Sequence, residues 1–173
     1  MPKILEYIRQ DIDKLAEKTG EEAKKINTKI KNDIASVAKS VKSINLKNDL
    51  LKLAKKGDEL VDKTGSSAGK LASEMKVDLN SITERIDLVE RLEKLGADFE
   101  KLADKSGTEA TRLLGKIKDE LQLIYNEEKS VDIKKEINNI IAKIDKLVEL
   151  TGNAAKKLAN EIKADIKKLA DKI

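Results

Sequence analysis

The chain repeats itself four times, and this repetition limits its fold more than any other feature of the sequence. Four fourteen-residue segments align without gaps; they read DKLAEKTGEEAKKI from Asp13, DELVDKTGSSAGKL from Asp58, EKLADKSGTEATRL from Glu100 and DKLVELTGNAAKKL from Asp145. Their glycines are 45, 42 and 45 residues apart. Such self-similarity is typical of chains built from one supersecondary unit. We therefore predict a single helical domain, residues 1–173, made of four tandem repeats of about 43 residues (1–45, 46–87, 88–132 and 133–173).

Apolar residues within each repeat are spaced as in a helix. In the first repeat, steps of four, four and three residues lead through Ile4, Ile8, Ile12, Leu15, Thr19, Ala23, Ile26, Ile30, Ile34, Val37 and Val41. Three such positions per eleven residues form a hendecad pattern, which predicts near-straight helices. Only 2% of the residues are aromatic and 39% are charged, a composition typical of long helices or coiled coils. The sequence therefore predicts an all-α fold.

A Thr/Ser-Gly motif at the centre of each repeat leaves two architectures open. The motif comprises Thr19, Gly20, Thr64, Gly65, Ser106, Gly107, Thr151 and Gly152. If it breaks the helix, its Thr and Ser residues are N-caps, Glu22 and Glu109 complete capping boxes, and the chain forms eight shorter helices arranged as αα-hairpins. If the helix continues, the chain forms a long antiparallel four-helix bundle. We favour this bundle, with the motif at mid-helix, because the apolar stripe crosses the motif in phase.

The second, third and fourth repeats each open on a recurring tripeptide that indicates the start of a helix. The tripeptides are Ile44-Asn45-Leu46, Ile86-Asp87-Leu88 and Val131-Asp132-Ile133. Asn and Asp are good N-caps, and in each case an apolar residue precedes them. We therefore expect the long helices to turn near Ser43, Ile86 and Ser130.

Residue types that carry most enzyme chemistry are missing. The chain has no His and no Cys, which removes the usual general base, the thiolate nucleophile and the common zinc ligands. No glycine-rich phosphate loop and no EF-hand spacing is present. We therefore predict that the protein is not an enzyme and has no catalytic residues, no metal site and no cofactor.

The charge pattern limits the classes of partner. The net charge is +4, and residues 133–173 hold the excess, with ten Lys against six acidic residues. Few aromatic side chains are available to stack on bases, so we do not expect nucleic-acid binding. The sequence contains neither a secretory leader nor an apolar run long enough to cross a membrane. The expectation is a soluble, cytoplasmic chain, with secretion left open if a leader was removed.

The eleven-residue apolar pattern, flanked by Lys and interspersed with Thr and Gly in segments such as EKTGEEAKKI and DKTGSSAGKL, resembles a known class of helix. It is similar to the amphipathic repeats of exchangeable apolipoproteins, synucleins and late-embryogenesis-abundant proteins. This resemblance implies reversible binding to lipid or to another apolar surface, with helices that open to expose their apolar stripes.

Two functions therefore follow from the sequence. The first is a non-catalytic structural or interaction protein, a helical bundle that acts alone or assembles with copies of itself. The alternative is a reversible lipid-binding protein. The fourfold regularity is expected equally of a natural scaffold, of a duplicated ancestor and of a designed sequence.

Overall fold

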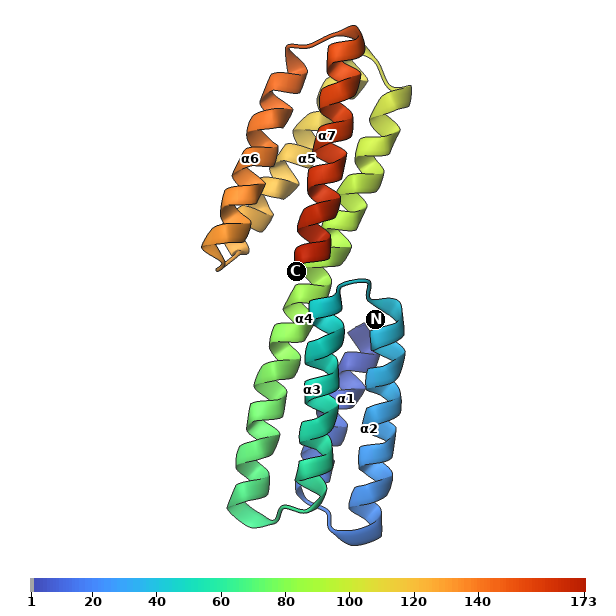
Figure 1. Ribbon diagram of the computed structural model, residues 1–173, viewed down its shortest axis with the longest axis vertical. Coiled ribbons are helices and arrows are strands. Elements are labelled where there is room, and N and C mark those ends of the chain that lie inside the picture. The colour runs from blue at the N-terminus through green and yellow to red at the C-terminus, as the bar shows by residue number, and fades with distance from the viewer. Residues whose placement is uncertain (1) are drawn as a thin grey trace. The chain divides into compact units, whose positions relative to one another are not determined.

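The protein is all-α, as the apolar periodicity predicts. The structure, a computed structural model, describes residues 2–173. Helices that follow one another in this part of the chain pack antiparallel (Figure 1). The elements are α1 (Pro2–Ala16), α2 (Gly20–Ser40), α3 (Ile44–Val61), α4 (Gly65–Lys101), the short 3₁₀ helix η1 (Leu102–Asp104), α5 (Gly107–Glu127), α6 (Val131–Val148) and α7 (Gly152–Lys172).

The chain divides into two compact units. Unit 1 comprises the residues up to Asp87 together with Ile173, and unit 2 comprises Leu88–Lys172. Unit 1 contains α1, α2, α3 and the first part of α4, whereas unit 2 contains the rest of α4, η1, α5, α6 and α7. The units meet in the sequence at the boundary between the second and third predicted repeats.

The predicted bundle of four long helices is wrong, because the Thr/Ser-Gly motif ends helices instead of lying within them. Thr19 has an extended backbone, with φ −136° and ψ 165°, and Gly20 follows with φ +61°. Ser106 and Gly107 have the same two conformations. A positive φ is easily adopted only by glycine. The open alternative of shorter helices in αα-hairpins is therefore closer to the structure, except that α4 is undivided.

The residues of the motif are exposed at the turns between helices. These are Thr19, Gly20, Thr64, Gly65, Ser106, Gly107, Thr151 and Gly152. Leu15 and Ala23, on either side of the first motif, are both buried in the same core. They are eight residues apart, which is slightly more than two helical turns. This spacing suits a continuous helix and also a hairpin whose two helices face one core, so the phase of the stripe did not distinguish the architectures.

The predicted N-caps at Asn45 and Asp132 are also wrong, because a serine two residues earlier caps each helix. The Ser43 hydroxyl accepts a hydrogen bond from the Leu46 amide at 3.2 Å, and the Ser130 hydroxyl accepts one from the Ile133 amide at 3.4 Å.

The predicted turn near Ile86 and the cap at Asp87 do not form. Arg85 stands at the position that corresponds to Ser43 and Ser130, and an arginine side chain has no acceptor for a backbone amide. No proline or glycine interrupts the sequence there. The helix therefore continues, and α4 extends to Lys101.

Thr19 and Ser106 occupy the N-cap positions of α2 and α5, but neither side chain makes a capping hydrogen bond. The capping boxes expected of Glu22 and Glu109 therefore do not form. Each glutamate instead forms an ion pair across the turn, Glu22 with Lys18 at 3.2 Å and Glu109 with Lys105 at 3.3 Å.

The apolar stripes form the core of each unit. In unit 1 the fully buried side chains include Ile8, Ile12, Leu15, Ile30, Leu46, Leu53 and Met75, and in unit 2 the buried side chains include Leu95, Ile117, Leu121, Ile137, Ile144 and Ile162. Burial of this Leu and Ile surface is the main force that holds the helices together. Within the described residues, no helix is both long enough and apolar enough to span a membrane.

Candidate functional site

The Thr/Ser-Gly motif does not gather into one site. In unit 1 the turns at Thr19–Gly20 and Thr64–Gly65 lie at the same end of the helices (Figure 1). The turns at Ser106–Gly107 and Thr151–Gly152 lie at one end of unit 2. All four glycines have a positive φ, so the motif forms the turns at which the chain reverses direction. The described part of the chain contains no group of three acidic, His or Cys side chains placed to hold a metal ion.

Four ion pairs between helices of unit 1 recur between helices of unit 2 at positions 87 residues further on. In unit 1 they are Lys76–Asp13 (2.6 Å), Lys31–Asp58 (3.0 Å), Lys56–Asp78 (2.6 Å) and Arg85–Asp49 (2.6 Å). In unit 2 they are Lys163–Glu100, Lys118–Asp145 (2.6 Å), Lys143–Asp165 (2.6 Å) and Lys172–Glu136. The same helix pairs are therefore joined in the same way in both units.

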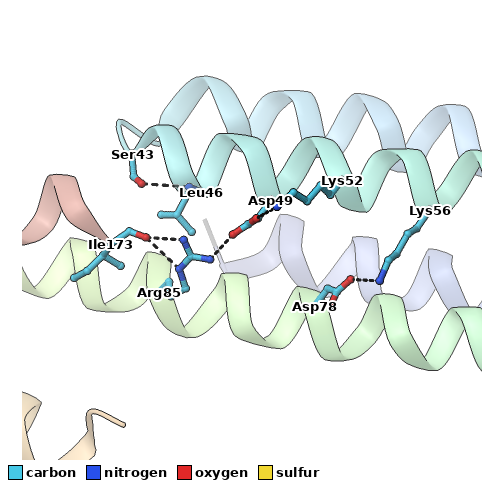
Figure 2. A network of polar contacts seen from close by, with 8 residues as sticks. All are labelled: Ser43, Leu46, Asp49, Lys52, Lys56, Asp78, Arg85 and Ile173. Atoms are coloured by element: carbon cyan, nitrogen blue, oxygen red, sulfur yellow. Dashed lines mark hydrogen bonds and ion pairs between the residues drawn. The ribbon is translucent and has the colours of Figure 1, made fainter. Parts of the chain in front are cut away.

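Figure 2 shows two of these pairs between α3 and α4, together with the Ser43 cap. The Arg85 guanidinium lowers the pKa of Asp49, and Lys52 adds to this effect. The hydrogen bond to Asp78 raises the pKa of Lys56. Because the paired groups are partly exposed to solvent, each pair contributes at most about 1 kcal/mol. Their repeated placement therefore favours a role in aligning neighbouring helices within each unit, more than in adding stability.

One buried polar contact in unit 1 has no counterpart in unit 2. Asn27 on α2 is 6% exposed, and its Nδ2 donates to Asp58 Oδ1 on α3 at 2.8 Å. Its Oδ1 is buried without a hydrogen-bond partner. A Cβ atom placed on Gly57 would lie 2.5 Å from this Oδ1, so any larger residue would have to displace the amide from its present position. The equivalent residues of unit 2 are Leu114 and Ile144, which are both buried.

Sequence reasoning missed this contact, although a signal was present. The stripe was assigned through Ile26, which is only partly buried, whereas its neighbour Asn27 is buried. Asn27 lies four residues after Ala23 and three before Ile30, which is the spacing of a core position. A polar residue at core spacing, together with a mid-helix glycine in the next helix, was the available indication.

A second polar contact differs between the units in how tightly it is packed. In unit 1 the Asp11 side chain is only 5% exposed and pairs with Lys14 at 3.3 Å and Lys29 at 2.6 Å. The hydrogen bond to Asp11 raises the pKa of Lys29, whose ammonium also lies 5.9 Å from the centre of the Tyr7 ring. In unit 2 the equivalent Asp98 is 25% exposed and pairs with Lys101 at 2.8 Å.

A shallow cavity lies beside Asp98. Its volume is about 180 Å³, and it is lined by Asp98, Lys101, Lys105, Glu109, Arg112, Leu113 and Lys116. Four of these side chains are basic and two are acidic. Arg112 and Lys116 are exposed at its rim, so the cavity is an open, mixed-charge surface and not an enclosed binding site.

Comparison of the chain with models of protein families, with curated proteins and with solved structures finds no match.

Proposed function

We propose that this chain is a non-catalytic structural protein, in which two helical units serve as a scaffold or spacer that interacts through its charged surface. One observation carries the proposal: the contacts that recur between the units, 87 residues apart, are those that hold helices together. The ion pairs Lys56–Asp78 and Lys143–Asp165 are one such equivalent couple. Because the repeated features are packing and helix pairing, the repetition supports a role that depends on shape.

The distribution of apolar side chains favours this role over lipid binding. The stripes that would face acyl chains are already buried inside each unit, for example at Ile8 and Ile137. The large apolar side chains that remain exposed are scattered over the helices; they include Ile44, Leu51, Val77, Leu123, Val131 and Val148. Single exposed apolar residues are common on soluble proteins and do not form a docking face by themselves.

The first experiment tests whether the stripes need an outside surface. Far-ultraviolet circular dichroism of dilute protein is recorded during heating, with and without vesicles that contain anionic lipid. High helicity and a melting curve that vesicles do not change support the scaffold. Low helicity that rises when vesicles are added, together with flotation of the protein with the vesicles, contradicts the scaffold and favours the apolipoprotein-like alternative.

Self-association is the second part of the proposal, with another copy of the chain as the partner. Sedimentation velocity over a wide range of protein concentration measures it directly. A mass that rises with concentration and falls again in high salt supports assembly through the charged surface, because salt screens exposed ion pairs. A monomer mass at every concentration removes self-assembly and leaves a scaffold that acts as a single chain.

A further inference from the structure

The repeated ion pairs do not by themselves specify which helices pack together, because equivalent helices of the two units carry the same charges. In unit 1, α2 and α3 are joined by Lys31 and Asp58, and in unit 2, α5 and α6 are joined by Lys118 and Asp145. Helix α2 would therefore meet the same charge at the same height on α6 as it meets on α3. The ion pairs do not distinguish the correct partner from the equivalent helix of the other unit, either in the same molecule or in a second copy.

The core contact between Asn27 and Gly57 does distinguish them. If α2 packed on α6 in place of α3, Asn27 would face Ile144 where it now faces Gly57. A single Cβ at this position already lies 2.5 Å from Asn27 Oδ1, and isoleucine adds three more carbon atoms. In the opposite exchange, Leu114 of α5 would face Gly57, which has no side chain to replace that of Ile144 at the equivalent position of α6. The core would be overfilled in the first exchange and underfilled in the second, and both changes destabilise a core.

The hydrogen bonding of Asn27 supports a role in selection, because the contact is not optimised for stability. Its Nδ2 is satisfied by Asp58, but its Oδ1 is buried and has no partner. A buried unsatisfied oxygen lowers the free energy of unfolding, and two apolar residues fill the same site in unit 2. A single buried polar residue that costs stability is a known means of fixing which helices pair and in what register.

We propose that the Asn27–Gly57 contact is the pairing determinant of this protein: it makes α2 accept α3 and reject α6, and so prevents the two units from exchanging helices within a molecule or between copies. Asp58 has a secondary part, since it holds the amide through Nδ2. The hydrogen bonds from Lys31 and then from Asn27 lower the pKa of Asp58, which keeps it ionised as their acceptor.

Disulfide trapping tests the pairing, because the chain has no cysteine of its own. The variant Lys31→Cys with Asp145→Cys forms a disulfide only when α2 meets α6. The variant Lys31→Cys with Asp58→Cys reports the native pairing of α2 with α3; it also removes the carboxylate that accepts from the Asn27 amide, so this variant tests pairing with the Gly57 contact alone. Each full-length protein is unfolded, refolded at high concentration and oxidised, and gel electrophoresis without reductant separates links within a molecule from links between copies.

The decisive comparison adds Asn27→Leu, which gives α2 the leucine that α5 carries at this position. We expect the 31–145 disulfide to be scarce with Asn27 present and to rise about fivefold or more with Asn27→Leu. The 31–58 disulfide should form in both backgrounds. If circular dichroism shows that Asn27→Leu does not fold, Asn27→Ala is used, since it also removes the Oδ1 atom that blocks Ile144.

The matched control is Leu53→Ala, which weakens the core of unit 1 at a fully buried position of α3 and leaves Asn27 and Gly57 in place. The 31–145 disulfide should remain scarce in this variant. The proposal is overturned if Leu53→Ala raises this disulfide as much as Asn27→Leu does, because loss of stability alone would then explain exchange. It is equally overturned if the 31–145 disulfide forms as readily as the 31–58 disulfide with Asn27 present.

Discussion

Units 1 and 2 share four ion pairs between helices but pack their turn ends differently. Leu15, just before the first Thr/Ser-Gly turn, is 1% exposed, whereas the equivalent Leu102 lies in η1 and is only partly buried. The same difference recurs around the turns, where Ala23, Ala68 and Leu71 are buried in unit 1 but Ala110, Ala155 and Leu158 are only partly buried in unit 2. The comparison teaches that recurring surface charges join neighbouring helices in the same way in both units, whereas apolar packing sets how tightly each end closes.

Shortening the leucine at the turn should have the largest effect. Leu15→Ala should lower the free energy of unfolding by about 2 to 5 kcal/mol, because it leaves a cavity in a closed core. Leu102→Ala should cost about half as much or less, since its side chain is partly solvated already. Hydrogen exchange measured peptide by peptide reports the opening of each unit separately. Equal losses in the two variants would show that the two turn ends are equally well packed, contrary to the comparison.

The turn glycines should give the next largest effect. Gly20→Ala and Gly107→Ala should each destabilise the protein by about 1 to 2 kcal/mol, because both glycines have a positive φ that costs an L-residue energy. No neighbouring atom lies within 4 Å of the added Cβ, so the loss measures backbone strain alone.

A matched pair of glycines lies inside helices. Gly69 in α4 and Gly115 in α5 also have open space around them, and alanine there should stabilise the protein by about 0.5 to 1 kcal/mol. Thermal melts followed by circular dichroism measure all four variants. Stabilisation by alanine at position 20 or 107 would contradict the turns and support a helix that continues through the motif.

The serine caps should differ modestly between the units. Ser43→Ala should cost about 1 to 2 kcal/mol, since Ser43 is buried and its bond to the Leu46 amide is 3.2 Å long. Ser130→Ala should cost about 0.5 to 1 kcal/mol, because its bond to the Ile133 amide is longer, at 3.4 Å. Chemical denaturation measures both, and Ser36→Ala on the exposed face of α2 is the control. A larger loss at Ser130 than at Ser43 would reverse the expected order.

Acid should weaken unit 1 by a small amount. The pKa values of Asp49 and Asp58 are lowered in the folded state, so the stability they contribute is present above the unfolded pKa of about 3.9 and is lost as the pH falls through the folded values. The midpoint of chemical unfolding should therefore fall as the pH drops below about 4. Replacing both residues by Asn should reduce this dependence; an unchanged dependence would assign it to other carboxylates.

Much of the secondary structure could be predicted from sequence, and the errors have specific causes. The repeats and the helical period depend on local spacing, and local spacing fixed the all-α class. The turn at Thr19–Gly20 was misassigned as part of a helix. The eight-residue spacing between Leu15 and Ala23 is compatible both with one continuous helix and with two helices that face the same core. The undivided α4 was missed because the prediction relied on Asp87 as a cap, whereas the serine that caps the other helices is replaced by Arg85.

The candidate contact at Asn27 and Gly57 could be only partly predicted. An alignment at 87 residues places Leu114 and Ile144 opposite them, so the difference between the units is visible in the sequence. That Gly57 lies directly against the Asn27 amide is not visible, because the two residues are on different helices and their distance depends on how closely α2 and α3 approach.

The sequence by itself determined the helical class, the repeat, most of the apolar residues that form the cores and the absence of His and Cys chemistry, because these depend on residue type and on spacing along the chain. Only the tertiary structure decided that the glycines reverse the chain, that α4 continues across the boundary between the second and third repeats, and that Asn27 is buried against Gly57. These features depend on which helices share a core, and packing between residues far apart in sequence settles that question.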